Sequence, residues 1–172
     1  MKVKKNKVIE ELTQDIISNY NIQIPINNID KVIEKLGGEV KESNNIEKLV
    51  KGRLKKENDN KFKIIIPIFK HKEDRTFAIA QELGHLFLHM GYQTNKKIWD
   101  KYKKNEYYDS DDVASELQAN YFAMALLMPK YRYIERVNNT IVDGRINVMN
   151  IAEYFGVSIS TAHTRGEIIG II

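Results

Sequence analysis

The residues of this chain that could do chemistry together stand in one short apolar stretch, Gln81-Glu82-Leu83-Gly84-His85. Its spacing is that of an H-E-x-x-H helix, in which residues four apart lie on one face and bind one Zn²⁺. The glutamate of that pattern lies beside the first ligand and turns a metal-bound water into a nucleophile. Here glutamine stands at the first ligand position. The stretch therefore predicts metal-assisted hydrolysis at a site with an altered first ligand.

A third ligand of such a site comes from elsewhere in the chain, and in one large class it is a glutamate on a following helix. Glu116 occupies that position, 31 residues after His85, and Asn120 lies one helical turn further on, where it could hydrogen-bond a ligand. His89 follows His85 by four residues. We interpret His89 either as part of a makeshift two-histidine site that bypasses Gln81 or as a structural or substrate-facing residue.

Composition limits the chemistry and the class of protein. The 172 residues include no cysteine, so disulfides and thiolate metal sites are excluded and a metal must be held by nitrogen and oxygen atoms. The 27 basic and 23 acidic residues give a net charge of +4, and the lysine-dense stretches 2–7 and 96–104 indicate solvated basic surface; we do not expect direct nucleic-acid binding. The sequence has neither an apolar stretch of the roughly 18 residues that a spanning helix needs nor a signal-peptide pattern. We expect a cytoplasmic protein with no membrane partner.

The first half of the chain predicts two helices and a hairpin. Apolar residues recur at helical spacing in the first twenty residues and again from Ile29 to Leu36, where Gly37-Gly38 ends the second helix. The stretches 49–56 and 62–69 flank a polar turn and predict two paired strands. Pro67 places the second strand at or near a sheet edge, because proline donates no ladder hydrogen bond.

The second half of the chain places the chemical residues on helices. Residues 72–90 predict a helix that Gly91 ends, and residues 112–128 predict another that Pro129 ends. The polar stretch 92–109 between them predicts a long loop, which we interpret as a partner-recognition flap or as a mobile surface loop. Residues 147–170 predict two short helices.

In its chemical residues the sequence resembles the ImmA/IrrE family of metallopeptidases. The family has an apolar helix H-E-L-G-H-x-x-L-H preceded by an arginine, then E-x-x-A-N-x-F-A-x-x-L-L-M-P, then a helical tail with F-x-V-S and an arginine. The matching residues lie between about 25 and 170 and are Arg75, Ala80, Glu82-Leu83-Gly84-His85, Leu88-His89, Glu116, Ala119-Asn120, Phe122-Ala123, Leu126-Leu127-Met128-Pro129, Phe155-Gly156-Val157-Ser158 and Arg165.

The resemblance implies an α+β fold, a small zincin-like domain with N-terminal helices, a short β-sheet or hairpin, an active-site helix and a C-terminal helical hairpin. We expect one domain over residues 1–172 that includes a helix-turn-helix-like tail, 145–172. The resemblance further implies a cytoplasmic regulatory zinc endopeptidase that cleaves a helix-turn-helix repressor, often one encoded in mobile elements such as phage or in stress regulons.

Carried over residue by residue, the resemblance gives His85 and Glu116 metal-ligand positions, Glu82 the general-base position and Gln81 the position of the missing histidine. A neutral amide oxygen is a poorer zinc donor than imidazole, so we expect zinc to be weakly bound or absent. Without a metal, Glu82 would be a buried acid that needs a partner such as Arg75. Two functions stay open: a zinc endopeptidase with weakened activity, and a catalytically inactive pseudopeptidase that binds a partner protein.

The tail also has two interpretations. Ala152, Gly156 and Ala162 match the spacing of a helix-turn-helix, whose second helix would present Arg165 outward. A DNA-reading helix normally offers several basic or amide groups, and this one offers a single arginine. We therefore favour a structural hairpin that covers the substrate side or docks the partner.

Overall fold

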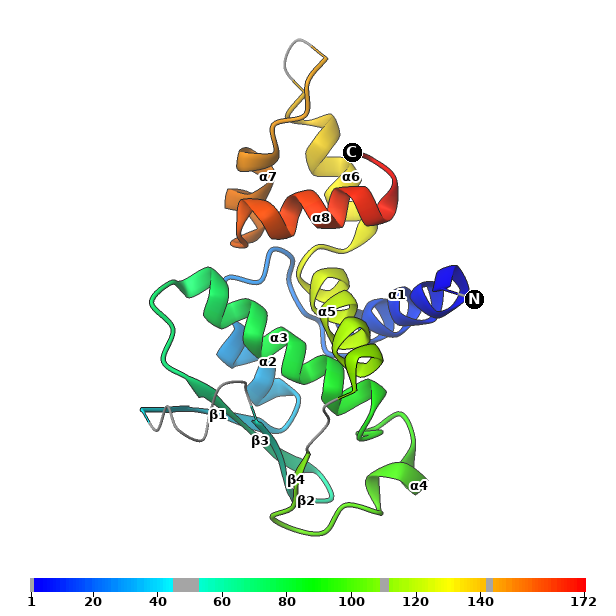
Figure 1. The fold of residues 1–172 in the computed structure, drawn as a ribbon, viewed down its shortest axis with the longest axis vertical. Coiled ribbons are helices and arrows are strands. Elements are labelled where there is room, and N and C mark those ends of the chain that lie inside the picture. The colour runs from blue at the N-terminus through cyan, green and yellow to red at the C-terminus, as the bar shows by residue number, and fades with distance from the viewer. Residues whose placement is uncertain (1, 45–52, 109–111, 142–143) are drawn as a thin grey trace.

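The computed structural model describes residues 2–44, 53–108, 112–141 and 144–172. Within these residues the chain forms eight helices and one four-stranded sheet (Figure 1). In chain order the elements are α1 (Lys2–Asn19), α2 (Ile29–Lys35), β1 (Gly38–Ser43), β2 (Arg53–Asn58), β3 (Lys61–Pro67), α3 (Lys72–Leu88), α4 (Lys96–Trp99), β4 (Tyr107–Tyr108), α5 (Val113–Leu127), α6 (Lys130–Asn138), α7 (Val148–Phe155) and α8 (Ile159–Ile169). The expected α+β class is confirmed.

The sheet has the strand order β1-β3-β2-β4. β1 pairs in parallel with β3, whereas β2 pairs antiparallel with both β3 and β4. The predicted hairpin is therefore present as β2 and β3, although residues 49–52 lie outside the described part of the chain. β3 is an interior strand next to the edge strand β1, so the prediction that Pro67 places it at or near a sheet edge holds only as nearness to the edge. Pro67 is its last residue, opposite Ser43, where the ladder ends and a missing N–H costs little.

The two faces of the sheet differ in chemistry. One face is apolar, with Leu54, Phe62, Ile64 and Ile66 at most 1% exposed, and it packs against the helices. The other face carries charged side chains, in which Lys63 Nζ lies 3.3 Å from Glu39 and 3.4 Å from Glu57. This alternation along the strands fixes which side of each strand faces α3.

A glycine lets α3 and α5 approach each other closely. A Cβ atom on Gly84 would lie 2.8 Å from the Cα and 3.0 Å from the carbonyl oxygen of Ala119, so only a residue without a side chain fits there. The motif glycine and the alanine of α5 thus bring the two helices together. Their contact sets the distance between the candidate site residues on α3 and Glu116 on α5.

The three C-terminal helices α6, α7 and α8 gather at the end of the molecule away from the sheet (Figure 1). Gly156 ends α7 in the left-handed region at φ 65°, and the side chain of Ser158 accepts a hydrogen bond from Thr161 N to cap α8. The predicted helical hairpin is therefore present. The prediction that Arg165 points outward is wrong, because its side chain is fully buried and donates to both carboxylate oxygens of Glu10 on α1, at 2.6 and 3.0 Å.

The stretch after α3 is more structured than a loop. It contains α4 and β4, and the side chains of Tyr92 and Trp99 belong to the core. The Tyr92 hydroxyl donates to the carbonyl oxygen of Leu36 at 2.7 Å, and the Trp99 indole N–H donates to that of Asp59 at 2.9 Å. These anchors fasten most of the stretch, so the long-loop prediction fails for residues 92–108; residue 109 lies outside the described part of the chain.

The described helices include none that is both long and apolar enough to cross a membrane.

Candidate functional site

The structure brings together three of the residues that the sequence singled out. Gln81 and His85 lie one turn apart on α3, and Glu116 faces them from the first turns of α5. The Gln81 side-chain N–H donates to Glu116 Oε2 at 2.9 Å, and His85 Nε2 lies 3.6 Å from Glu116 Oε1. Glu116 thus stands between the two α3 residues, with one carboxylate oxygen toward each.

Part of this arrangement fits a zinc ion. Two ligands that are each about 2.0–2.1 Å from a tetrahedral zinc lie about 3.3–3.4 Å apart. The 3.6 Å between His85 Nε2 and Glu116 Oε1 is close to that value. His85 and Glu116 therefore have the donor atoms and nearly the separation that a shared metal requires.

The first ligand position does not fit. A catalytic zinc has three protein ligands, and the described residues contain no group of three or more His, Asp or Glu side chains that could hold a metal ion. Gln81 directs its amide N–H toward Glu116, and the reverse orientation would set its carbonyl oxygen against a carboxylate oxygen. The hydrogen bond therefore ties up an oxygen of Glu116, and the full set of residues does not match a three-ligand zinc site.

His89 does not supply the missing ligand in this arrangement. His85 and His89 face each other through their Nδ1 atoms at 3.1 Å, whereas His85 turns its other ring nitrogen to Glu116. The two histidines and Glu116 therefore do not converge on one point, and the two-histidine site stays a hypothesis. Burial lowers the pKa of His89, and the contact of its Nε2 with Gln118 acts in the opposite direction.

Glu82 lies on α3 beside Gln81 and is 7% exposed. Its burial suits either of the roles predicted for it, a general base or a buried acid. The guanidinium of Arg75, which we expected beside Glu82, instead pairs with both carboxylate oxygens of Asp30, at 2.8 and 2.9 Å, and with Glu42 at 2.6 Å. The hydrogen bonds from Arg75 lower the pKa of Asp30. Together with the bond to Glu42, they make Arg75 a link between α2, β1 and α3.

Comparison with known proteins decides the family. The family model described as the IrrE N-terminal-like domain, a family of peptidases, matches residues 50–166. This chain belongs to that family. A search of the curated proteins finds no match. The family match runs from just before β2 to α8 and includes Gln81, Glu82, His85 and Glu116, so the site lies within the matched region. The resemblance found in the sequence is thereby confirmed, and the chain is a metallopeptidase-family protein.

One residue of this family member's site was not predicted individually. Tyr108, from β4, lies with its ring centroid 5.2 Å from that of His85 and 6.1 Å from that of His89, nearly parallel to the latter at 13°. β4 is paired with β2, so the sheet carries this tyrosine to the site. The sequence offers one signal, the density of tyrosines in 92–108, and it does not show which ring reaches the histidines.

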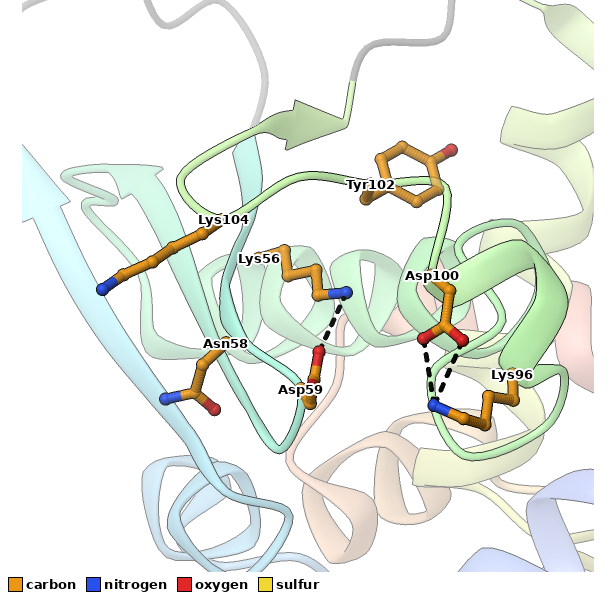
Figure 2. Close-up of a pocket in the computed structure, with 7 residues that line it drawn as sticks. All are labelled: Lys56, Asn58, Asp59, Lys96, Asp100, Tyr102 and Lys104. Atoms are coloured by element: carbon orange, nitrogen blue, oxygen red, sulfur yellow. Dashed lines mark hydrogen bonds and ion pairs between the residues drawn. The ribbon is translucent and has the colours of Figure 1, made fainter.

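A separate polar cavity lies at the far end of β2 and is lined by Lys56, Asn58, Asp59, Lys96, Asp100, Tyr102 and Lys104 (Figure 2). Figure 2 shows Lys56 directed to Asp59, with Nζ 3.4 Å from the carboxylate, and Lys96 directed to Asp100 at 3.1 Å. Lys56 is buried and also donates to the carbonyl oxygen of Trp99 at 3.0 Å. The bond to Trp99 fastens β2 to α4, and none of the candidate site residues lines this cavity.

Proposed function

We propose that this member of the IrrE N-terminal-like family has weakened or lost hydrolytic activity and acts mainly by binding a helix-turn-helix repressor-type protein. The observation that carries the proposal is the hydrogen bond from the Gln81 amide to Glu116 Oε2, at 2.9 Å. In a working zinc site that carboxylate would face a metal. Here it faces an amide N–H and His85, which satisfy it without one.

A zinc ion that took Gln81 as its third ligand would have to displace the hydrogen bond from Gln81 to Glu116. For Gln81 to become a ligand its amide must turn over, which breaks this bond, and the metal gains only a neutral amide oxygen. Removing an imidazole from the first coordination sphere should cost more than the 10- to 100-fold typical of changes in the residues that support ligands. Glu82 then has no metal-bound water to activate.

The nature of the partner comes from the family resemblance, which implies a repressor of the helix-turn-helix class as the protein acted upon. The exposed side of α8 favours a protein partner over DNA, because a DNA-binding helix normally offers several basic or amide side chains. On this side His163 lies 3.5 Å from the carboxylate of Glu167, so it does not add an unpaired positive charge. We place the protein in the cytoplasm as one domain over residues 1–172, with repressor control in a mobile element as its setting.

A second candidate function keeps a specific observation in its favour. His85 Nε2 and Glu116 Oε1 retain nearly the spacing of two zinc ligands. A weakened zinc endopeptidase, with the Gln81 oxygen as a poor third ligand and Glu82 as the base, would use that pair.

Binding and cleavage can be separated in one assay. The purified protein is mixed with purified helix-turn-helix repressors, with added zinc or with chelator, and complex formation and fragment production are followed by size-exclusion chromatography and mass spectrometry. We expect a complex under both conditions, with the repressor intact or cleaved only slowly. Rapid zinc-dependent cleavage would favour the second candidate, and a failure to form any complex would overturn the binding proposal.

A further inference from the structure

The polar cavity at the far end of β2 lies apart from the candidate site and is large enough to hold a small molecule. Its volume is about 570 Å³, within the range of about 300–1,000 Å³ that is typical of ligand sites. One lining side chain, that of Lys56, is only 5% exposed, whereas that of Lys96 is 81% exposed. The cavity therefore combines one buried ammonium group with charged side chains that solvent reaches.

The buried ammonium group of Lys56 has a counter-charge that an anion could replace. Lys56 Nζ donates to the carbonyl oxygen of Trp99 at 3.0 Å and lies 4.6 Å from the centre of its indole ring. The carboxylate beside it belongs to Asp59, which lies in the turn between β2 and β3 and is 79% exposed. Their separation of 3.4 Å exceeds the 2.7–2.9 Å of a charge-assisted hydrogen bond. A ligand anion in the cavity can therefore approach the same ammonium group more closely.

The remaining lining residues offer further hydrogen-bond donors. Lys96 Nζ lies 3.2 and 3.1 Å from the two carboxylate oxygens of Asp100, in an exposed ion pair that solvent weakens. Lys104 also lines the cavity, and it has no ion pair within the part of the chain that the structure describes. The side-chain oxygen of Asn58 accepts from Asn60 N at 2.9 Å, which leaves the amide NH₂ group of Asn58 as a donor.

The surroundings of the cavity are basic even when their ion pairs are counted. The lysine-dense stretch 96–104, which forms one wall, contains five lysines and one aspartate. Glu106 follows this stretch, and its carboxylate accepts from Lys103 N at 2.6 Å. Together with Lys56 and Asp59, these residues comprise six lysines and three acidic residues, a net charge of +3. A cavity with such walls attracts anions.

We propose that this cavity binds a small molecule that carries a diphosphate group. The phosphate oxygens would accept from Lys56 and Lys96, and Lys104 would turn toward them from the rim. A diphosphate has enough oxygens and charge for three ammonium groups, which a single carboxylate lacks. The diphosphate is either free or part of a nucleotide, whose ring would lie against the half-buried ring of Tyr102. The inference goes beyond the proposed function, because it needs neither zinc nor the repressor.

Isothermal titration calorimetry with inorganic pyrophosphate and with ADP, in metal-free buffer of low ionic strength, tests the proposal. Lys96→Gln and Lys104→Gln should each weaken the binding of both probes by about five- to tenfold, for loss of one charged contact. Lys97→Gln is the matched control, because Lys97 is exposed in the same stretch but does not line the cavity; it should change the affinity less than about twofold. Tyr102→Leu distinguishes the two sources of diphosphate, since it should weaken ADP alone if the ligand is a nucleotide.

Asp59→Asn tests the buried lysine without removing it. The variant loses the carboxylate that competes for Lys56, so pyrophosphate should bind about fivefold more tightly or better. The variant should also unfold at a lower Tm without ligand, and pyrophosphate should raise its Tm more than that of the unsubstituted protein.

Three outcomes would overturn the proposal. The first is that neither probe binds, and the second is that Lys97→Gln weakens binding as much as Lys96→Gln and Lys104→Gln, which would indicate general attraction to the basic stretch. The third is that a single-stranded oligonucleotide displaces ADP, because the stretch would then take nucleic acid. Each of these results leaves the repressor proposal standing, since its binding assay contains no phosphate compound.

Discussion

Gln81 is the residue on which the proposed loss of activity depends. It lies on α3 one turn before His85, at the position that the family resemblance gives to a ligand, and its amide joins α3 to Glu116 by a hydrogen bond that needs no metal. The side chain at position 81 thus links α3 to α5 through a polar pairing.

Replacing Gln81 with histidine should create a zinc site. The variant adds a third ligand to His85 and Glu116, whose donor atoms are already 3.6 Å apart. Zinc that binds only the folded state stabilises it by RT ln(1 + [L]/Kd), about 2.7 kcal/mol at a hundredfold excess over Kd. Thermal unfolding with and without zinc checks this, and the unsubstituted protein should retain well under one equivalent of zinc after dialysis. A Gln81→His variant whose Tm is unchanged by zinc would contradict the assignment of His85 and Glu116 as metal ligands.

In that restored background, Glu82 should prove to be the base and not a ligand. If the Gln81→His variant cleaves a repressor, adding Glu82→Gln should lower the cleavage rate by at least about 100-fold, the lower range for loss of a general base. Zinc affinity should change little, because the substituted residue does not coordinate the metal. Rates come from fragment analysis and affinity from calorimetry. Unchanged cleavage would remove Glu82 from the chemistry.

The sequence could predict the meeting of His85 and Glu116 because helical spacing and a family motif both describe local or recurrent geometry. It could not predict that the Gln81 amide would bond to Glu116, which depends on how closely α5 approaches α3. The contact of Tyr108 with the two histidines could not be predicted either. Its position over the histidines depends on the pairing of β4 with β2, and two residues are too few to show a strand's alternation.

At the scale of elements, α3 and α5 were predicted well, since apolar periodicity and the stops at Gly91 and Pro129 define them. The strand order was not predictable, because pairing joins segments that are distant in sequence. Pro67 predicted a strand at or near an edge, but a proline shows only that a ladder hydrogen bond is missing, not whether the strand is at an edge or only ends there. The prediction that Arg165 points outward failed because its partner Glu10 is at the other end of the chain, where no local pattern indicates the pair.

Gly84→Ala tests the contact between these two helices. The added methyl group would meet the backbone of Ala119 at 2.8–3.0 Å, which forces α5 away from α3. We expect a loss of about 1–3 kcal/mol in the free energy of unfolding. Ala119→Gly in the same protein should not restore it, because the obstructing atoms are backbone. Urea unfolding of the single and double variants measures both effects, and full rescue by the second substitution would refute this account of the packing.

For the whole molecule, the decisive contact joins the first helix to the last. The fully buried Arg165 on α8 donates to Glu10 on α1, to which Tyr121 on α5 also donates at 2.7 Å. Arg165 lies inside the family match and Glu10 lies outside it. We infer that α1 is an obligatory part of the fold, in line with the proposal of one domain over 1–172.

Glu10→Gln should therefore destabilise the protein strongly. It leaves a buried guanidinium without its counter-charge, and breaking such a pair by removing one partner typically costs about 3–5 kcal/mol. Glu11→Gln is the matched control, since Glu11 is exposed and pairs with Lys7 across 3.7 Å; it should change stability by less than about 1 kcal/mol. Replacing both charges, by Glu10→Gln with Arg165→Met, should recover part of the loss. Urea unfolding measures the stability of all three variants. Equal losses at positions 10 and 11 would argue against a stabilising role of the pair between Arg165 and Glu10.

The contact among Glu10, Tyr121 and Arg165 should also make the folded protein sensitive to alkali. Burial, and next the hydrogen bond to Glu10, raise the pKa of Tyr121 to about 12 from its ordinary value of 10.0. Between these values the unfolded chain releases the phenolic proton and the folded chain keeps it. Since the folded state then holds more protons, stability falls as pH rises through this window, by up to about 1.4 kcal/mol for each pH unit from this one group. Tyr121→Phe removes the ionisable group, so its unfolding free energy should decline less steeply between pH 10 and 12 than that of the unsubstituted protein, although it starts lower for loss of the Glu10 hydrogen bond. Parallel slopes for the two proteins in urea unfolding would show that Tyr121 titrates in the folded state as it does in the unfolded one, and that α1, α5 and α8 do not enclose it as the distances indicate.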